Sequence, residues 1–234
     1  MVKVIKKLIL PKISRLNDYN STFVIVMGIL LRINPDKPSG RDIDKVTACL
    51  REGGVIIYPT DTVYGIGCDI HKQKAVERIC KIKNIHPEKA NFSFICYDLS
   101  HLSDFTKIVD TSTYKLMKKA LPGPFTFVLE ANNSVPKLFM SKKKTVGIRI
   151  PDNNICREIV KQLGNPIMST SVHDTDNIIE YTTDPDLIYE RYKNSVDIII
   201  AGGFGNNQVS TVVDCTDVNY TVLRQGLGNL EEYL

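Results

Sequence analysis

The stretch 58-YPTDTVYGIGCD-69 places two threonine hydroxyls, an aspartate and a tyrosine directly after the apolar run 53-GGVII-57. In α/β proteins, the residues that contact ligands gather where strands end. Thr60 and Thr62 can donate hydrogen bonds to carboxylate or phosphate oxygens, and the two glycines would let a ligand approach the backbone. The same side chains could instead satisfy their own turn. The stretch is therefore a candidate anion-binding turn, with a self-satisfied turn as the alternative.

Basic side chains follow on a predicted helix over about residues 72–84. Arg78 and Lys81 stand at i, i+3 on one face of this helix, and Lys83 lies near its end. The group could hold a triphosphate, although lysines in a last helical turn also interact favourably with the helix dipole. Farther along, 166-PIMSTSVH-173 places hydroxyls and a histidine after a short apolar run. A lone histidine of this kind is more often a surface or capping residue than a catalyst.

Several common kinds of site have no signature in the sequence. Neither G-x-x-x-x-G-K-[ST] nor G-x-G-x-x-G is present, and no Ser-His-Asp or Cys-His order stands out. The six cysteines form no Cys-x-x-Cys pair, and the four histidines show no ligand spacing. These patterns predict reduced thiols, a cytoplasmic location and no protein-bound metal site.

Charge and hydropathy separate the first 26 residues from the rest. The net charge of +4 resides entirely in residues 1–26, so that residues 27–234 are neutral overall. The apolar run 23-FVIVMGILL-31 is too short to span a membrane and lacks a cleavage motif. We therefore expect residues 1–26 to be an N-terminal extension, either disordered or an over-long start, with a targeting role as the alternative. Residues 27–234 are predicted to form one domain, and no membrane contact is expected.

Hydrophobic periodicity predicts alternating helices and strands without long linkers. Helices are expected over about residues 40–54, 72–84, 111–120, 152–163 and 184–193, and strands over 27–33, 55–58, 92–96, 125–130, 145–150, 196–203, 209–214 and 220–224. Strands that are apolar throughout imply a sheet covered by helices on at least one face. The predicted fold class is therefore α/β with a mixed sheet.

The order of several short motifs is more informative than any one of them. PTDTVYG, K-x-K with a downstream asparagine, PGPFT, VGIRIP, STS, VSTVVD and VLRQG follow one another along the chain. This series resembles the YrdC-like family of threonylcarbamoyl-AMP synthases over about residues 27–234. The segments 34-NPDKP-38 and 91-NFSFICYDLSHLSDF-105 look most similar to its YciO-like branch.

The resemblance implies a twisted mixed sheet around a deep cavity. It also implies synthesis of threonylcarbamoyl-AMP and pyrophosphate from L-threonine, bicarbonate and ATP, for the threonylcarbamoyladenosine of tRNA. Mg²⁺ would accompany ATP, and no tightly bound cofactor is expected. RNA, either tRNA or double-stranded RNA, is a further implied partner. The alternative is a YciO-like RNA- or nucleotide-binding protein with little or no synthase activity.

The same resemblance suggests roles for individual residues. The implied catalytic residues are Lys81, Lys83, Ser171 and His173; the substrate-binding residues are Thr62, Ser210 and Arg149; and the ATP-binding residues are Lys83, Asn91, Thr126 and Arg224. Two of these depart from the synthase pattern, because Lys83 stands where the synthases have arginine and His173 where they have asparagine. A lysine is a point charge without the planar fork of arginine, and a histidine offers different donors from an amide.

Overall fold

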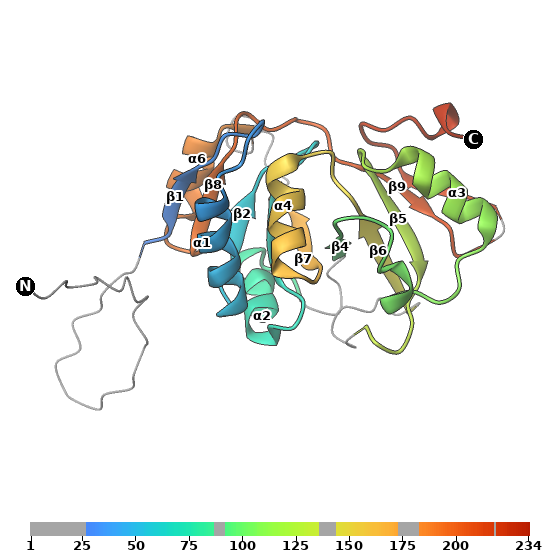
Figure 1. Cartoon of the computed structure of the whole chain (residues 1–234), viewed down its shortest axis with the longest axis horizontal. Coiled ribbons are helices and arrows are strands. Elements are labelled where there is room, and N and C mark those ends of the chain that lie inside the picture. The colour runs from blue at the N-terminus through green and yellow to red at the C-terminus, as the bar shows by residue number, and fades with distance from the viewer. Residues whose placement is uncertain (1–26, 87–91, 136–143, 173–182, 218) are drawn as a thin grey trace, which may run out of the picture.

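One mixed sheet of ten strands forms the centre of the protein (Figure 1). The computed structural model describes residues 27–86, 92–135, 144–172, 183–217 and 219–234. The strands are β1 (Ile29–Arg32), β2 (Ile56–Tyr58), β3 (Gly65–Asp69), β4 (Ser93–Ile95), β5 (Phe125–Glu130), β6 (Thr145–Arg149), β7 (Ile167–Ser171), β8 (Ile198–Ala201), β9 (Thr211–Asp214) and β10 (Thr221–Arg224). Their order across the sheet is β1-β8-β2-β3-β7-β4-β6-β5-β9-β10. Parallel and antiparallel neighbours are interspersed, which confirms the predicted mixed α/β class.

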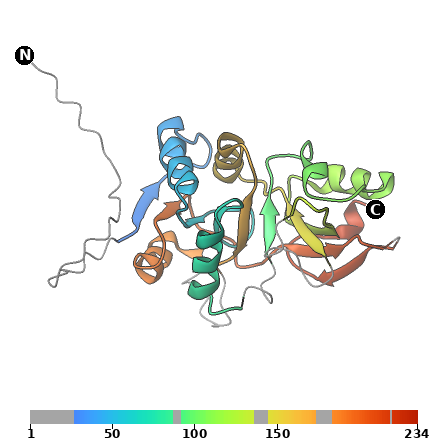
Figure 2. The same ribbon diagram turned by 90° about the horizontal axis from the view of Figure 1, so that it is seen from below.

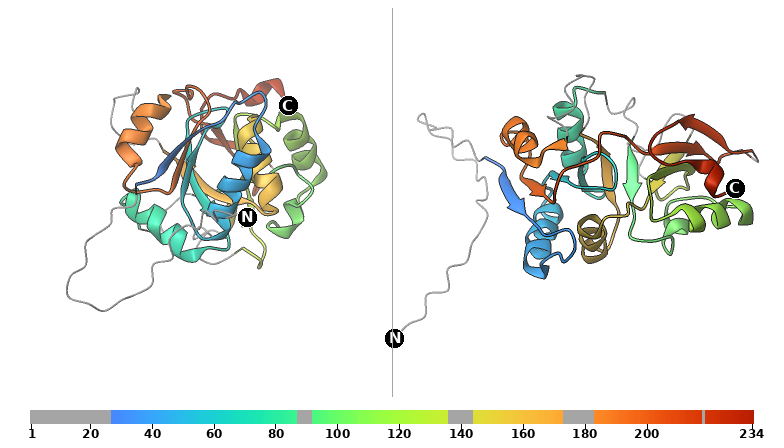
Figure 3. Two further views of the ribbon diagram at one scale, coloured as in Figure 1. Left: turned by 60° about the vertical axis from the view of Figure 1, so that its left-hand side comes forward. Right: turned by 90° about the horizontal axis from the view of Figure 1, so that it is seen from above.

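Helices cover both faces of the sheet. The α-helices are α1 (Gly40–Arg51), α2 (Gln73–Ile82), α3 (Thr111–Ala120), α4 (Asn154–Leu163) and α6 (Pro185–Tyr192), and short 3-10 helices are η2 (Leu102–Asp104) and η4 (Leu230–Glu232). Helices α1 and α4 lie side by side on one face, and α2 and α6 lie on the other (Figures 2 and 3). None of the described helices is long and apolar enough to cross a membrane.

Strand alternation supplies an apolar core to each face. In β2, Ile56 and Tyr58 belong to the cluster packed under α1 and α4, whereas Ile57 belongs to the larger cluster that includes α2 and α6. β8 alternates in the same way, with Ile198 on the first face and Ile199 on the second. Successive side chains of a strand point to opposite faces, so β2 and β8, which are buried on both faces, must be apolar throughout. This accounts for the continuous apolar runs in the sequence.

Local capping explains where several helices begin and end. The carboxylate of Asp110 accepts hydrogen bonds from the backbone N–H groups of Ser112 and Thr113 at the start of α3. Asn153 caps α4 in the same way, and Gly164 ends that helix in the left-handed conformation at φ +84°. Ser39 occupies the N-cap position of α1 as predicted, but its side chain makes no capping hydrogen bond.

The sequence prediction was wrong about two central strands. β3 and β7 pair antiparallel over five residues, and β3 also pairs with β2. Residues 59–64 consequently form the loop of a hairpin, and Gly65 and Gly67 lie in β3. A Cβ on Gly65 would lie 2.9 Å from the ring of Tyr58, and one on Gly67 would lie 2.7 Å from the Ile167 side chain. The glycines therefore make room for neighbouring side chains of the sheet, rather than for a ligand.

Candidate functional site

The hairpin loop between β2 and β3 is held by one buried arginine. Arg149, the last residue of β6, donates from Nη2 to Thr60 Oγ1 at 3.1 Å, Asp61 Oδ1 at 2.5 Å and Thr62 Oγ1 at 2.6 Å. The Arg149 and Asp61 side chains are only 11% and 10% exposed. We call these four residues the arginine cluster. β6 and the hairpin are remote in sequence, and the sheet brings them together.

The arginine cluster is incompletely paired. Nη2 carries two hydrogens and faces three oxygens, whereas the Nε of Arg149 and the Oδ2 of Asp61 are buried without a partner in the described part of the chain. The other terminal nitrogen, Nη1, makes no hydrogen bond to the described residues either. Buried polar groups are normally paired. Arg149 therefore retains donor capacity for an anion.

A pair of buried hydroxyls lies between β5 and the start of β9. Thr126 Oγ1 and Ser210 Oγ are 2.9 Å apart, and β5 and β9 run parallel through this region. Arg224 on β10 reaches the same place, because its Nη2 lies 2.9 Å from the Ser210 carbonyl oxygen and 3.3 Å from Ser210 Oγ. The structure thus brings together three of the predicted binding residues.

The two arginines are electrostatically coupled. Arg224 stands on the exposed strand β10, but partial burial of its guanidinium lowers its pKa, and the nearby positive charge of Arg149 lowers that pKa further. Arg224 forms no ion pair with a carboxylate in the described ranges, where its contacts are the Ser210 oxygens. Like charges held near each other repel. An anion placed between them would relieve that repulsion.

The predicted catalytic residues are placed less closely together. Lys83, just beyond α2, donates from Nζ to the carbonyl oxygen of Val172 at 3.3 Å. That residue follows Ser171, which is half-buried at the end of β7 and pairs with Gly65. Lys81 is exposed in the last turn of α2. The structure therefore brings Lys83 and Ser171 to the same strand end and leaves Lys81 at the surface.

Other predicted residues lie elsewhere. Asn91 and His173 are outside the described residues. Arg78, which the sequence offered as part of a triphosphate group, donates to Asp197 at 2.6 Å and to the Ser195 carbonyl at 2.7 Å. These contacts tie α2 to the segment before β8. Arg78 therefore has a structural partner. The basic side chains Arg78, Lys81 and Lys83 do not gather at one triphosphate site.

An open cavity of about 560 Å³ adjoins the arginine cluster. It is lined by Thr60 and Asp61 from the hairpin loop, by Thr183, and by Phe204, Gly205, Asn206 and Asn207 from the segment after β8. Except for Phe204 and Gly205, the lining side chains are polar. This cavity therefore continues the arginine cluster toward solvent.

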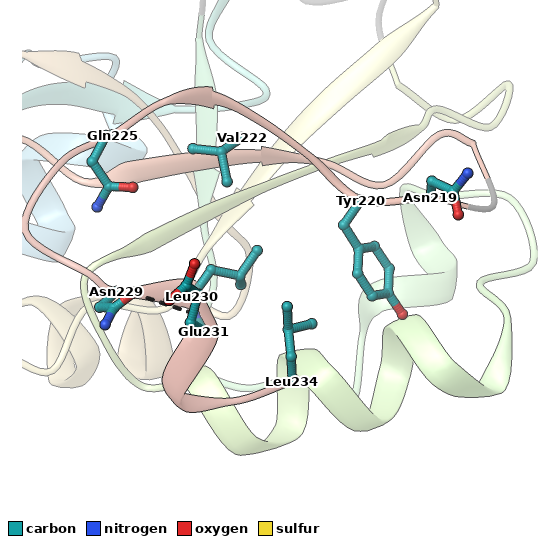
Figure 4. A pocket seen from close by; sticks show the side chains of 8 residues that line it. All are labelled: Asn219, Tyr220, Val222, Gln225, Asn229, Leu230, Glu231 and Leu234. Atoms are coloured by element: carbon teal, nitrogen blue, oxygen red, sulfur yellow. Dashed lines mark hydrogen bonds between the residues drawn. The ribbon is translucent and has the colours of Figure 1, made fainter.

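A second cavity, near the C-terminus, has a different character. It lies between β10 and η4, and Val222, Leu230 and Leu234 project into it beside Glu231 (Figure 4). Its lining contains no cationic side chain. It is thus unsuited to an anionic substrate. Across the described ranges, no three His, Cys, Asp or Glu side chains gather as metal ligands.

Asp61 is the member of the site that the sequence prediction missed. It stands between the two threonines of PTDT, where a carboxylate looks like an ordinary turn residue. The sequence did indicate that Asp61 is buried, because it lies between the apolar strand β2 and the apolar pair Val63 and Tyr64. A carboxylate buried there requires a cationic partner.

The protein is therefore an α/β protein with a mixed sheet. Arg149 and Arg224, at the ends of β6 and β10, form a candidate anion-binding site. A family model described as Telomere recombination, Sua5_yciO_yrdC, matches residues 48–226. The chain belongs to this Sua5/YciO/YrdC family, which confirms the family indicated by the motif series.

Individual relatives agree with this assignment. Uncharacterized protein YciO of Escherichia coli (strain K12) is 41% identical over 210 residues, which cover 89% of this chain and 100% of YciO. The threonylcarbamoyl-AMP synthase of Vibrio vulnificus (strain YJ016) is 26% identical over 188 residues, covering 79% of this chain and 98% of the synthase. Similarity is thus higher to YciO than to this synthase.

Solved structures show the same fold. The crystal structure of E. coli YciO matches with a TM-score of 0.82 at 39% identity, covering 89% of this chain and all of YciO. A doubly substituted Sua5 of P. abyssi matches with a TM-score of 0.79 at 27% identity, covering 87% of this chain and 62% of Sua5. Sua5 of the same organism has also been crystallised with L-threonine.

Proposed function

We propose that this chain is a nucleotidyltransferase of the threonylcarbamoyl-adenylate type. It would convert L-threonine, bicarbonate and ATP to threonylcarbamoyl-AMP and pyrophosphate, for modification of tRNA in the cytoplasm. The observation that carries the proposal is the pair of coupled arginines, Arg149 and Arg224, beside buried hydroxyls. A site that must hold a carboxylate and several phosphate oxygens together needs such donors.

The chemistry requires positioning more than a reactive side chain. Bicarbonate gives CO₂ by loss of hydroxide, and the threonine nitrogen attacks the carbon of CO₂. The nitrogen gives its proton to that hydroxide, so the products are a carbamate and water. A carbamate oxygen then attacks the α-phosphorus of ATP, and pyrophosphate leaves. The nucleophile belongs to the substrate, so the protein must align two anions and exclude water from the labile carbamate.

Each part of the site has a task in this scheme. The free donor capacity of Arg149, with Thr62 beside it, suits the threonine carboxylate, in keeping with the L-threonine complex of Sua5. Arg224 and the Thr126–Ser210 hydroxyl pair suit phosphate oxygens of ATP. Lys83 supplies positive charge for the departing pyrophosphate. Mg²⁺ would arrive with ATP as part of the substrate.

A second candidate function is binding of RNA or nucleotide with little synthase activity. It is favoured by the lysine positions, because Lys81 is exposed and Lys83 offers a compact charge in place of a bidentate fork. A site that binds both substrates but aligns them about 1 Å away from the reactive geometry loses on the order of a hundredfold in rate.

Pyrophosphate release that depends on both threonine and bicarbonate tests the first proposal. Wild-type protein should release pyrophosphate with all three substrates and not when either threonine or bicarbonate is omitted. Arg224→Ala should lose this activity. Arg32→Ala is the matched control, because Arg32 is an exposed arginine that pairs with Asp186 at the opposite end of the sheet. ATP binding without any pyrophosphate release would favour the second candidate.

A further inference from the structure

The segment after β8 exposes one aromatic side chain at the rim of the 560 Å³ cavity. Phe204 is 79% exposed and lies within the sequence 202-GGFG-205. A single exposed hydrophobic side chain is ordinary on a protein surface. The exposure of Phe204 indicates a binding surface only because hydrogen bonds hold the surrounding backbone in place.

Three hydrogen bonds fix this segment against the hairpin loop and its neighbours. The hydroxyl of Tyr64 donates to the carbonyl oxygen of Gly203 at 2.6 Å. The backbone N–H of Gly205 donates to Thr183 at 2.8 Å, and that of Asn206 donates to Thr62 at 3.0 Å. The segment is therefore anchored to the same loop that forms the arginine cluster.

Steric and backbone constraints explain why three residues of this segment are glycines. A Cβ on Gly202 would lie 2.7 Å from Pro59, and one on Gly205 would lie 2.8 Å from the ring of Tyr64. Gly203 has φ +98°, which side-chain-bearing residues rarely adopt. Phe204 is the one residue of the four with a side chain, and most of that side chain is exposed. The segment thus exposes an aromatic ring on a backbone that three hydrogen bonds hold in place.

The chemistry around the ring is that of a nucleobase site. Asn206 and Asn207 line the same cavity as Phe204. Asn206 Oδ1 accepts a hydrogen bond from the backbone N–H of Gln208 at 3.1 Å, so the amide NH₂ of Asn206 and the amide group of Asn207 are the groups that can pair with the edge of a base. An aromatic face stacks on any base. The cavity also includes Thr60, which accepts a hydrogen bond from Arg149. The α-phosphate must meet the carbamate of a threonine held at Arg149, so it would lie beside this cavity. A planar polar group attached to an anion would therefore find a suitable partner at each end of this arrangement.

We propose that Phe204, Asn206 and Asn207 form a stacking platform for a nucleobase, supplied either by free ATP or by an unpaired base of RNA. The proposal rests on the proposed function in one respect, namely that the α-phosphate of ATP meets the carbamate of a threonine held at Arg149. It adds the residues that would recognise the base. In this arrangement Arg149 holds threonine, Arg224 holds the phosphates and Phe204 holds the base.

Tryptophan fluorescence provides a direct test, because the chain contains no tryptophan. Phe204→Trp introduces a single reporter at the platform, to be titrated with ATP, with tripolyphosphate and with a single-stranded oligoadenylate. Stacking on a base should quench the fluorescence. Tripolyphosphate has no base and should leave it unchanged. Ile108→Trp is the matched control, because Ile108 is fully exposed and does not line the cavity.

The two nucleobase sources give different results. Quenching by ATP identifies a free nucleotide as the ligand, and quenching by oligoadenylate alone identifies RNA. Phe204→Ala should weaken binding of the quenching ligand about tenfold, within the usual range for a lost base–aromatic stack, and leave tripolyphosphate affinity unchanged.

Several results would overturn the platform. Equal quenching of the Ile108→Trp reporter, or no quenching at Phe204→Trp by ligands that bind wild-type protein, would remove it while leaving the anion site intact. Equal affinity of Phe204→Ala and wild type would do the same. Quenching at Phe204→Trp in a protein that releases no pyrophosphate would instead retain the platform and reject the synthase proposal. If neither ATP nor oligoadenylate bound wild-type protein, both proposals would fall.

Discussion

Arg149 is expected to stabilise the fold as well as the site, and Arg149→Met tests this. The substitution removes the partner of Asp61 Oδ1, while Asp61 Oδ2 already lacks one among the described residues. The carboxylate is 10% exposed, so its charge would remain buried and uncompensated. Removing one partner of a buried pair typically costs about 3–5 kcal/mol. For a domain of this size, we therefore expect a fall in Tm of roughly 6–20 °C.

Urea and thermal unfolding measure this loss, and a second substitution separates charge from packing. Asp61→Asn makes the partner neutral, so the double variant should lose less than the sum of the single variants, by at least about 1.5 kcal/mol. Arg32→Met is the control, because the Arg32–Asp186 pair is 66% and 56% exposed and should be worth less than about 1 kcal/mol. The reasoning would be refuted if Arg149→Met cost no more than Arg32→Met.

Three further predictions concern the site and the extension. Arg224→Ala should weaken ATP binding by about 1–3 kcal/mol in calorimetry, and more than Lys81→Ala, because only Arg224 reaches the buried hydroxyls; equal losses would contradict this placement. Lys83→Arg combined with His173→Asn should raise the rate of threonylcarbamoyl-AMP formation at least about tenfold, equivalent to roughly 1.4 kcal/mol of barrier; an unchanged rate would mean that these departures do not limit alignment. A chain that begins at Met27 should fold and bind ATP as the full chain does, and insolubility of that product would show that residues 1–26 are needed.

Elements with a strong local signal were predictable from the sequence. α3 begins at Thr111 and ends at Ala120, as predicted, because an aspartate cap precedes it and a proline follows soon after it. β3 was missed because GIGCD contains two glycines and little β-branched surface. This segment is a strand because Gly65 packs closely against Tyr58, a tertiary contact that the local sequence does not reveal.

The site was predictable as a set of residues but not as a geometry. Thr62, Arg149, Ser210 and Arg224 were named from the order of motifs, yet no local pattern says that Arg149 meets the hairpin loop. That contact depends on the sheet order, in which β7 and β4 separate β3 from β6, the strand that ends at Arg149. Asp61 was missed for the same reason. Its role becomes visible only when the buried guanidinium is placed beside it.

The position of β8 has a consequence for synthesis of the chain. β1 and β2 are neighbours in sequence but do not pair with each other, because β8 lies between them and pairs in parallel with both. Until residues 198–201 leave the ribosome, both early strands present unpaired edges rich in isoleucine and leucine. Such edges are prone to intermolecular pairing. A chain terminated before β8 is therefore expected to aggregate even though it retains most of its sequence, and nascent-chain quality control should act on it late in translation.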